Sequence, residues 1–471
     1  MAKQSISGFP EWLPGQRLIE QHVLDTLRRV FELHGFVGIE TRAVDPLPAL
    51  EAKGETSKEV YVLQRLQAAR AVAQGDAAPQ ALTSRTLGLH FDLTVPLARY
   101  VLQNAHDLVF PLRRYQIQKV WRGERPQEGR FREFTQADID IVGFEHLGFH
   151  HEVEAAQVML QALDALGIGP VLMEVNNRKL LQALLANVGT QPGTANGDGN
   201  GSFDFNDVLR VLDKYDKVGP RGVAEELSVA GLPSDQIDLV LAVAAITAAS
   251  SQELREKVAA LGVQGDEVDR GLDELCALLD GAGAAAPGQV QASLRIARGL
   301  DYYTGSVYET LLPGYQGFGS ICSGGRYDSL VSQGRRIYPG VGLSIGVTRL
   351  VSLILSQDLL QASRPTPTVV LVAVNSEETR RASEAVATAL RERGISTLVS
   401  HSAAKFGRQI REAERRGIPY VWFPPGEPGA EDELAGEVKD IRTGQQSPAN
   451  ASDWAPPGDD LRPVVQAPTH N

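Results

Sequence analysis

The stretch from residue 113 to residue 144 constrains the fold of this chain more than any other. Two runs in it, residues 115–121 and 134–142, alternate between polar and apolar side chains, and a loop with Pro126 and Gly129 joins them. Period-two alternation on both sides of such a loop predicts an antiparallel hairpin of two long strands. The face of each side chain then follows from its place in the alternation.

The second strand of this hairpin has two contrasting faces. Alternation puts four side chains on one face: Phe134, Gln136, Asp138 and Asp140. This face combines an aromatic ring, an amide and two carboxylates, beside a loop that is dense in arginine. Such a surface can hold a polyphosphate at the loop and a cationic or hydrogen-bonding group further along the sheet. An ordinary charged hairpin in solvent is the competing interpretation, because the loop has no general phosphate fingerprint.

Residues 121–144 resemble motif 2 of the class II aminoacyl-tRNA synthetases, in the form typical of the histidyl-tRNA synthetase family. That motif reads R-x-E-R-P, a short loop, G-R-[FY]-R-x-F-x-Q and then an acidic residue. The matching residues, in order, are Arg122, Glu124, Arg125, Pro126, Gly129, Arg130, Phe131, Arg132, Phe134, Gln136 and Asp140. So many fixed positions in so short a span make the resemblance specific.

Two further segments resemble the histidine-specific motifs of this family. One is R-G-L-D-Y-Y-T-G, which begins at Arg298, and the other is residues 319–328, GSICSGGRYD. The first follows a predicted strand from residue 294, on which Leu294, Ile296 and Arg298 share a face. That face points Arg298 into a core or a pocket, where a guanidinium needs an anionic partner. A carboxylate of the fold and a phosphate both satisfy this requirement.

A third segment, residues 87–98, reads as a strand that ends at Pro96. Alternation puts Asp92 and Thr94 on one face, where a carboxylate and a hydroxyl can receive an ammonium group. A turn that satisfies both side chains locally is the alternative. The resemblance assigns this Asp92-Leu93-Thr94 segment to the amino-acid pocket, at the α-amino group of the substrate.

Motifs 1 and 3 of the class are also recognisable, each with one departure. Residues 15–34 have helical apolar spacing, and residues 37–44 read as a strand; together they resemble motif 1, which implies a homodimer. The family usually has Pro where this chain has Arg42. Residues 341–354 read as a strand and a helix and resemble motif 3, in which Arg349 would face the ATP phosphates. The family usually has Glu before that arginine, and here the residue is Thr348.

The C-terminal part has the pattern of a small α/β domain. Apolar runs at residues 369–374, 395–399 and 419–423 alternate with helical patterns. The run K-F-G-R-Q from Lys405 and the later G-I-P-Y resemble the anticodon-binding domain shared by several class II synthetases. Four arginines give one helix positive charge, and two glutamates dilute it, so a solvated helix competes with a nucleic-acid face. These residues are Arg408, Arg411, Arg415, Arg416, Glu412 and Glu414.

A chain of 471 residues is too long for one core and predicts two or three domains. The predicted fold class is α+β: an antiparallel catalytic sheet flanked by helices, a helical insertion and a C-terminal α/β domain. The expected boundaries are a catalytic domain in residues 1–173 and 291–356, an insertion in 174–290, a linker in 357–367, an anticodon-binding domain in 368–445 and a disordered tail in 446–471.

Composition excludes several classes of protein. The net charge of −12 argues against a protein that coats nucleic acid, although local basic patches can still bind a tRNA. No apolar run approaches the length of a membrane span, and the start lacks the apolar core of a signal peptide. Cys276 and Cys322 offer neither a disulfide framework nor a metal cluster. A cytoplasmic protein without a metal site of its own is therefore expected.

The resemblance implies a histidine–tRNA ligase activity in two steps, with L-histidine, ATP accompanied by Mg²⁺, and tRNA(His) as partners. Its implied site residues fall into three groups. Arg122 and Arg298 would hold the α-phosphate and the substrate carboxylate, with Arg298 in place of a metal found in other class II enzymes. The nucleotide would meet Glu124, Arg130, Phe134 and Arg349. The amino acid would meet Asp92, Leu93, Thr94 and Gln136 at its α-amino group, and Asp140 with Tyr302 or Tyr303 at its imidazole.

Two other functions compete with this interpretation. One is the synthetase-like regulatory subunit of ATP phosphoribosyltransferase, which generally lacks the anticodon domain and degrades the motif around the arginine equivalent to Arg298. The other is a class II-like ligase that activates a carboxylic acid without tRNA. This chain keeps both the arginine motif and the segment from Lys405 onward, which favours the synthetase.

Overall fold

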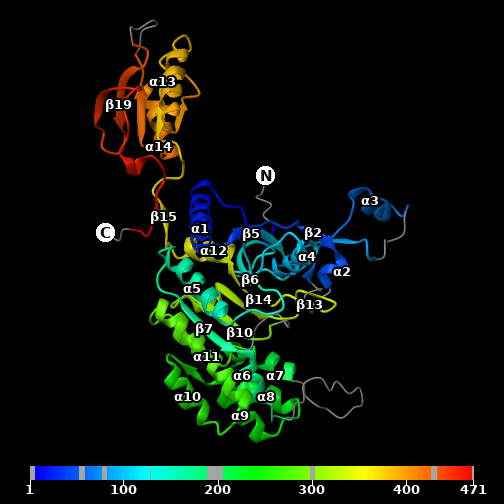
Figure 1. Ribbon diagram of the computed structural model, residues 1–471. Helices are drawn as coiled ribbons and strands as arrows, with labels where there is room; N and C mark the ends of the chain where they lie inside the picture. The colour runs from blue at the N-terminus through cyan, green and yellow to red at the C-terminus, as the bar shows by residue number, and fades with distance from the viewer. Residues whose placement is uncertain are drawn as a thin grey trace. The chain divides into compact units, whose positions relative to one another are not determined.

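The structure is a computed structural model, and it describes residues 6–51, 59–76, 82–127, 129–186, 188, 205–296, 303–425 and 432–468. The chain divides into two compact units. The first consists of residues 1–10 and 23–353, and the second of residues 11–22 and 354–471 (Figure 1). Arg298 and Tyr302 lie outside the described residues.

The first unit is built on a nine-stranded sheet, counted over the described residues. From edge to edge its strands are β1 (Val37–Gly38), β5 (Leu112–Trp121), β6 (Glu133–Val142), β14 (Gly340–Gly346), β11 (Cys322–Tyr327), β10 (Ser306–Leu311), β7 (Leu172–Asn177), β9 (Val290–Ser293) and β8 (Thr247–Ala248). Neighbours are antiparallel except for the pairs β1–β5 and β7–β9, which are parallel. The mixed α+β class with a mainly antiparallel sheet is therefore confirmed.

The hairpin predicted from alternation is present as β5 and β6. The two strands pair antiparallel over their full length, from Leu112 opposite Val142 to Trp121 opposite Glu133. On β6 the apolar face, which includes Ile139 and Ile141, is fully buried. The polar face is buried as well from Gln136 onward, so both faces of this strand are covered. The hairpin is thus a central part of the sheet and not a charged ribbon in solvent.

Helices of the first unit cover the sheet and extend beyond one edge of it. They are α2 (Leu47–Glu51), α3 (Leu66–Gln74), α4 (Thr94–Asn104), α5 (His150–Asp164), α6 (Arg178–Leu184), α7 (Phe205–Leu212), α8 (Tyr215–Val229), α9 (Ser234–Ala244), α10 (Ser251–Ala259) and α11 (Asp266–Ala285). The helices from α6 to α11 gather beside the β7 end of the sheet (Figure 1). Strand β7 spans residue 174, so the helical segment begins only after this strand.

Three strand predictions in the first unit need correction. Residues 37–44 do not form one strand: β1 (Val37–Gly38) joins the large sheet, and β2 (Val44–Pro46) joins a small sheet with β4 (Leu87–Leu89) and β3 (Val62–Leu63). The strand expected from residue 294 ends earlier, as β9, at Ser293. Leu294 and Ile296 are buried in the turn that follows, and apolar burial there gives the same alternation as a strand. The third correction, at residues 87–98, belongs to the site described below.

Helix α1 (Pro14–Leu33) agrees with the helical pattern at residues 15–34, and helix α12 (Val347–Ser356) follows β14 as the strand and helix predicted over residues 341–354 require. Proline opens α1, where its missing N–H costs nothing. The apolar stripe of α1 includes Val23, Leu27 and Phe31, all fully buried. Among the described helices, none combines the length and apolar composition that a bilayer crossing requires. A short hairpin of β12 (Ser332–Gln333) and β13 (Arg336–Ile337) precedes β14.

The second unit is an α/β domain with a five-stranded sheet over the described residues. Its strand order is β17 (Thr397–Val399), β16 (Val370–Val372), β18 (Tyr420–Phe423), β19 (Ala435–Asp440) and β20 (Gln446–Asn450), and its helices are α13 (Arg380–Glu392) and α14 (Phe406–Arg416). The first three strands are parallel, as expected for strands connected through helices. Trp422 and Val386 are fully buried in its core.

The prediction of a disordered tail at residues 446–471 is wrong for its described part. Strand β20 pairs with β19, and β21 (Val465–Gln466) pairs with β15 (Gln361–Ala362) in the segment expected to be a linker. Asp460 accepts a hydrogen bond from the Tyr420 hydroxyl at 2.7 Å. The Pro- and Asp-rich composition suggested disorder, but an open edge at β19 supplies the backbone partners that order the segment.

Candidate active site

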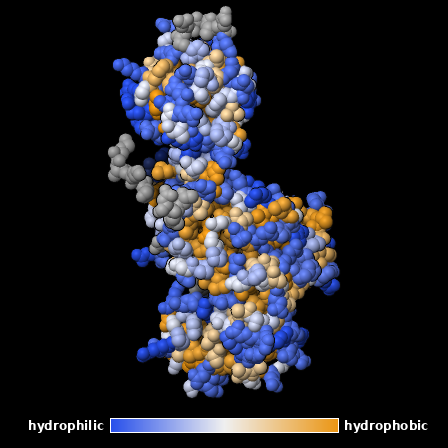
Figure 2. Space-filling view, turned by 90° about the vertical axis from the view of Figure 1, so that its left-hand side faces the viewer, coloured by the Kyte–Doolittle hydropathy of each residue, from blue (hydrophilic) through white to orange (hydrophobic). Residues whose placement is uncertain are grey.

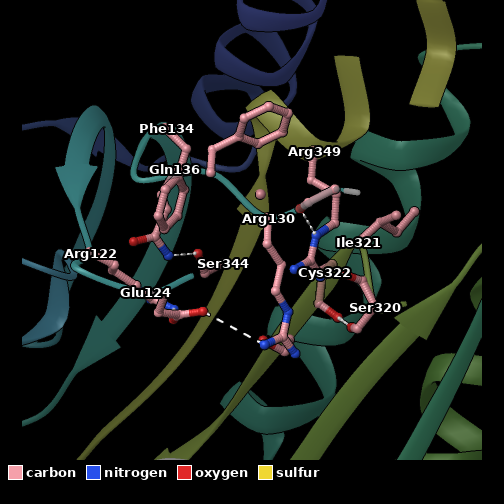
Figure 3. A pocket seen from close by; sticks show the side chains of 14 residues that line it. Arg122, Glu124, Arg130, Phe134, Gln136, Ser320, Ile321, Cys322, Ser344 and Arg349 are labelled. Carbon is pink, nitrogen blue, oxygen red and sulfur yellow. Dashed lines mark hydrogen bonds and ion pairs between the residues drawn. The ribbon is translucent and has the colours of Figure 1, made fainter. Parts of the chain in front are cut away.

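A pocket lies over the polar face of β6, next to the loop of the hairpin (Figure 3). Six of the residues assigned to the nucleotide and the amino acid line it together: Arg122, Glu124, Arg130, Phe134, Gln136 and Arg349. They come from the ends of β5 and β6, from the connecting loop and from α12. Ser320, Cys322, Ser344 and neighbouring residues close the opposite side. The pocket thus brings together residues that are far apart in sequence and that the alternation and the motif spacing had indicated.

Arg122 is held in place by three neighbours. Its Nε donates to the backbone oxygen of Phe91 at 3.0 Å, and its guanidinium carbon lies 5.1 Å from the centre of the Phe134 ring. Glu124 is 3.7 Å away, and the same carboxylate lies 3.7 Å from Arg130 (Figure 3). Because both arginines lie at the outer limit of an ion pair with one carboxylate, they retain donors for an anion.

Arg349 enters the same pocket from the first turn of α12. Its Nε donates to the Gly129 oxygen at 2.7 Å, and its Nη1 donates to the Ser320 oxygen at 2.6 Å. Burial lowers the pKa of Arg349 from its ordinary value, and the nearby guanidinium groups of Arg130 and Arg122 lower it further. Three guanidinium groups therefore share one pocket, which favours a polyanionic ligand.

The departure from the family pattern at Thr348 has a structural counterpart. The Thr348 hydroxyl accepts a hydrogen bond from the backbone N–H of Thr135 at 2.8 Å, and this joins α12 to β6. The position of Arg349 follows from that anchor and from its own two carbonyl contacts. At the other departure, Arg42 pairs with Asp45 at 2.6 Å.

Beyond the residues that line this pocket, β6 continues to a buried group of charged side chains, which form the inner end of the site. Arg114 on β5 is fully buried, and its Nη2 lies 2.6 Å from Oδ2 of Asp140. The hydroxyl of Tyr327 donates to Oδ1 of the same carboxylate, also at 2.6 Å. Neither Arg114 nor Tyr327 was predicted as a site residue. Arg114 could have been predicted, because it lies directly opposite Asp140 in the hairpin register. Tyr327 lies in the histidine-specific motif at residues 319–328, but its contact with Asp140 depends on the order of strands in the sheet.

Asp92 lies at this inner end, but not on a strand. Strand β4 ends at Leu89 and α4 begins at Thr94, so the predicted strand over residues 87–98 is wrong, as is the shared strand face of Asp92 and Thr94. Pro96 does not end a strand; it sits in the first turn of a helix, where proline is tolerated. Oδ1 of Asp92 accepts from the Val95 N–H at 3.1 Å, as in a helix cap.

Burial raises the pKa of Asp92 to about 6, although the Val95 N–H and the guanidinium groups of Arg122 and Arg114 oppose this shift. Its Oδ2 has no hydrogen-bond partner among the described residues. Leu93 is fully buried, and its backbone oxygen accepts from Arg114 at 3.4 Å. Asp92 therefore has an acceptor without a partner at the inner end of the site.

Tyr303 lies next to the same carboxyl groups. Burial raises the pKa of its hydroxyl above the ordinary value, and the charges of Asp140, Asp138 and Asp92 add to the shift. A phenol that stays protonated can donate a hydrogen bond at any physiological pH. Of the two tyrosines left open by the sequence, Tyr303 is the one that the structure describes.

Two glycines on β14 make room for these groups. A Cβ atom at Gly342 would lie 2.1 Å from Oδ1 of Asp140, and one at Gly340 would lie 2.4 Å from the Tyr327 ring. These separations are far below contact distance, so any larger residue would displace the carboxylate or the phenol. The floor of the inner end thus depends on glycine at both positions.

Two other chemical possibilities find little support. Burial raises the pKa of the Cys322 thiol to about 12, which keeps it protonated and a poor nucleophile. Within the described part of the chain, no group of three or more His, Cys, Asp or Glu side chains has the arrangement of a metal site. The one carboxylate that lines the outer pocket is Glu124. The outer pocket thus offers a cation one carboxylate from its own lining.

A largely antiparallel sheet, with an arginine-lined pocket at a hairpin and a further arginine from a strand–helix unit, defines a class II aminoacyl-tRNA synthetase. The family model described as histidyl-tRNA synthetase matches residues 8–350, and that of the anticodon binding domain matches residues 368–446. The chain belongs to the histidyl-tRNA synthetase family.

Individual relatives agree with this assignment. A histidine–tRNA ligase from Micrococcus luteus is 53% identical over 98% of both chains. One from Cutibacterium acnes is 51% identical, again over 98% of both chains. Among solved structures, histidyl-tRNA synthetase from Nostoc sp. PCC 7120 superposes with a TM-score of 0.77 at 31% identity, covering 96% of this chain and 97% of that one.

Proposed function

We propose that the protein activates L-histidine with ATP and transfers the histidyl group to the 3′ end of tRNA(His). One observation carries the proposal: a single strand, β6, leads from a pocket with three guanidinium groups to a buried set of carboxyl groups. The outer end suits the phosphates of ATP, and the inner end suits the ammonium and imidazole groups of histidine. The reactive carboxylate and α-phosphate would then meet between the two ends.

In the first step an oxygen of the histidine carboxylate attacks the α-phosphorus of ATP. An O–P bond forms, the bond to the bridging oxygen breaks, and pyrophosphate leaves with the electron pair. The substrate supplies the nucleophile, so the protein contributes alignment and stabilisation of charge. We assign the α-phosphate to Arg122, the outer phosphates to Arg130 and Arg349, and the adenine to Phe134 with Glu124. Mg²⁺ would enter with ATP and share the charge of its phosphates.

The α-ammonium group of histidine would lie between Asp92 and Gln136. Oδ2 of Asp92 and Oε1 of Gln136 both lack a partner among the described residues, and both are acceptors. Leu93 and Thr94 complete this part of the pocket in the proposal. An ammonium group satisfies both acceptors, whereas a substrate without it leaves two buried polar groups unpaired.

The imidazole would bind between Asp140 and Tyr303, with Tyr302 as the second candidate. A carboxylate that accepts and a phenol that donates or accepts can address both ring nitrogens and fix the tautomer. Arg114 and Tyr327 hold the Asp140 carboxylate in place for this contact. Arg298 keeps the role that the resemblance gives it, at the α-phosphate and the substrate carboxylate.

In the second step the terminal ribose hydroxyl of tRNA attacks the histidyl carbonyl, and AMP leaves. We infer that residues 368–445 bind the anticodon and that residues 174–290 approach the acceptor stem. The anticodon assignment is supported by the family match at residues 368–446 and by Arg408, Arg411 and Arg415 on α14. Exposed basic side chains on a helix suit a phosphate backbone.

We further infer a homodimer in the cytoplasm. Strand β1 is an edge of the large sheet, and the neighbouring Leu33 and Val37 are exposed. Figure 2 shows extensive hydrophobic surface on the first unit, as expected of a face that pairs with a second copy. Both cysteines are free and buried thiols, which fits a reducing compartment.

Histidine-dependent exchange of labelled pyrophosphate into ATP tests the first step, and charging of tRNA(His) transcript tests the second. The regulatory subunit of ATP phosphoribosyltransferase, the alternative function, would show neither reaction. We expect pyrophosphate exchange with histidine and none with the other amino acids. Lack of exchange in a folded preparation would overturn the proposal.

A further inference from the structure

Asp138 is a buried carboxyl group for which the mechanism above has no role. It lies on β6 between Gln136 and Asp140, on the same face, and is 3% exposed. Its Oδ1 has no hydrogen-bond partner among the described residues. Burying a carboxyl group with a free acceptor costs folding free energy, so an interaction elsewhere must offset this cost.

A hydrogen-bond relay connects Asp138 to the α-amino site. Ser344 on β14 lies directly opposite Asp138 in the sheet register, so its hydroxyl and the Asp138 carboxyl group lie side by side on one face of the sheet. The same hydroxyl oxygen accepts from Nε2 of Gln136 at 2.7 Å, as drawn in Figure 3. A serine hydroxyl has one hydrogen to give. Because the Ser344 oxygen accepts from Gln136, the hydroxyl hydrogen is available to Asp138, the carboxyl group opposite it.

This relay fixes the orientation of the Gln136 amide. With Nε2 bound to Ser344, Oε1 is turned away from the serine, and it has no partner among the described residues. If the amide were rotated by half a turn, Ser344 would have to donate to Gln136, and Asp138 would lose its donor. The acceptor at the end of the relay therefore decides which atom of Gln136 faces the ligand.

The charges around Asp138 favour a cation in this space. Asp138, Asp92 and Asp140 are three buried carboxyl groups, and Arg114 is the one fully buried guanidinium among the described residues. Burial raises the pKa of Asp138 to about 7; Asp140 and Asp92 add to the shift, while Arg114 and Ser344 oppose it. An ammonium group placed beside Gln136 would stabilise the charged form of Asp138.

We propose that Asp138 is a positioning residue of the amino-acid pocket: through Ser344 it holds the Gln136 oxygen toward the α-ammonium group of the substrate. The inference rests on the proposed function and adds a specificity-determining pair, Asp138 and Ser344, to it. Both residues act through Gln136 and not on the nucleotide. Their loss therefore weakens the use of histidine selectively.

Three variants and a control test the relay in pyrophosphate exchange. Ser344→Ala removes the bridge, Asp138→Leu removes the terminal acceptor, and Asp138→Asn keeps an acceptor oxygen. Ser293→Ala is the control, because Ser293 is a buried serine on β9 of the same sheet whose hydroxyl has no hydrogen-bond partner among the described residues. Histidine KM, ATP KM and kcat are measured for each, with the melting temperature of the same preparation.

Ser344→Ala and Asp138→Leu are each expected to raise the histidine KM about tenfold or more, since each misdirects one hydrogen bond to a charged group. The ATP KM should stay within about twofold of wild type by the same reasoning. Asp138→Asn should keep most of the affinity for histidine. The double variant Ser344→Ala/Asp138→Leu should be no worse than the poorer single variant, because both break one relay.

Different outcomes would contradict the relay and the proposed ligase function. A wild-type protein without histidine-dependent exchange would overturn the proposed function itself. An active wild type whose Ser344→Ala variant keeps its histidine KM would overturn the relay, whatever the melting temperature. An equal rise in both KM values would also overturn it. If Asp138→Leu fails to fold, Ser344→Ala and Asp138→Asn still decide the question.

Discussion

The arginine-lined pocket at the outer end of the site and the buried charged group at its inner end use the same kinds of side chain in opposite environments. At the outer end the side chains of Arg122 and Arg130 are 32% and 47% exposed, and they share one carboxylate at 3.7 Å. At the inner end Arg114 has no exposed surface, and its ion pair with Asp140 is 2.6 Å long. The exposed arginines lie at the outer limit of an ion pair with Glu124, whereas the buried arginine forms a short ion pair shielded from water.

The difference suggests that the two ends serve recognition in different ways. Partly exposed guanidinium groups attract any polyphosphate, and their interaction with it is weakened by water and salt. Buried carboxyl groups with unpartnered oxygens, such as Oδ2 of Asp92, penalise every ligand that fails to satisfy them. Affinity for the nucleotide would thus come from charge, and selectivity for the amino acid from burial.

The largest effect should follow from breaking the inner ion pair. Asp140→Ala leaves the Arg114 guanidinium buried without its partner, which costs about 3–5 kcal/mol in the free energy of unfolding. We also expect the histidine KM to rise steeply and the ATP KM to change little. Urea unfolding and pyrophosphate exchange measure the two effects on the same preparation.

A double variant, Arg114→Met/Asp140→Leu, separates stability from recognition. Replacing a buried pair by apolar residues of similar size is often neutral, so stability should return. The use of histidine should not return, because the imidazole still lacks its carboxylate. A double variant that exchanges normally would show that Asp140 has only a structural part.

The next largest effect should come from the outer end. Arg349→Lys keeps the positive charge but loses the planar group that donates to the oxygens of Gly129 and Ser320. Exchange should slow on the order of 10²–10³-fold, the usual cost of one misaligned donor. Histidine binding without ATP, measured by calorimetry, should be unchanged. Arg336→Lys, on the exposed β13, serves as the control.

A single methyl group added at the inner end should have a smaller effect, and it should raise the histidine KM more than the ATP KM. Gly342→Ala places a Cβ atom 2.1 Å from the present position of Oδ1 of Asp140, so the carboxylate must move. Overpacking of this kind costs about 1–3 kcal/mol, and we expect the histidine KM to rise by a corresponding factor. Gly283→Ala is the matched control, because no atom lies within 4 Å of its added carbon. Equal effects on the two KM values would contradict the assignment of Gly342 to the inner end.

The smallest effect concerns pH and Asp92. A carboxyl group with its pKa raised to about 6 loses its charge below that pH, so the histidine KM should rise as pH falls through 6. One pH unit below the pKa, the rise attributable to Asp92 is about tenfold. Dividing the histidine KM of Asp92→Asn by that of wild type at each pH removes the effect of the titration of histidine itself. This ratio should shrink toward low pH; a constant ratio would remove Asp92 from the α-amino site.

The raised pKa of Asp92 has the opposite effect on folding: low pH weakens the binding of histidine but favours the folded state. Because the carboxyl pKa is raised from 3.8 to about 6 on folding, the native state binds this proton more tightly than the unfolded chain. The contribution of Asp92 to stability is therefore favourable below pH 4 and declines as pH rises to about 6. Asp92→Asn should remove that decline in urea unfolding.

Local patterns predicted the outer end well. The period of two on β6 and the strand–helix change before Arg349 are properties of neighbouring residues, and the structure has both. The resemblance to motif 3 predicted that Arg349 faces the ATP phosphates, and in the structure Arg349 contacts Gly129 of the hairpin loop. Residues 87–98 failed because Pro96 reads equally well as the end of a strand and as the first turn of a helix.

The inner end was less predictable because its partners are remote in sequence. Tyr327 and Asp140 are separated by 187 positions, and their contact depends on the order of strands β6, β14 and β11. Alternation gives the face of a residue but not the neighbouring strand. For the same reason the pairing of β20 with β19 was not predicted: the composition of residues 446–450 suggested disorder and gave no sign of a neighbouring strand.

The return of the chain end to β15 has a consequence for biosynthesis. Residues Val465 and Gln466 pair with Ala362 and Gln361, which leave the ribosome about a hundred residues earlier. A nascent chain can complete the first unit while it is still being translated, since its residues all precede residue 354. The second unit needs Gln446–Asn450 for its sheet and Val465–Gln466 for the pairing with β15, so it cannot be completed before these residues are synthesised. Its core, including Ala451, therefore stays open until then, and a chain that ended before Gln446 would expose this surface to chaperones and proteases.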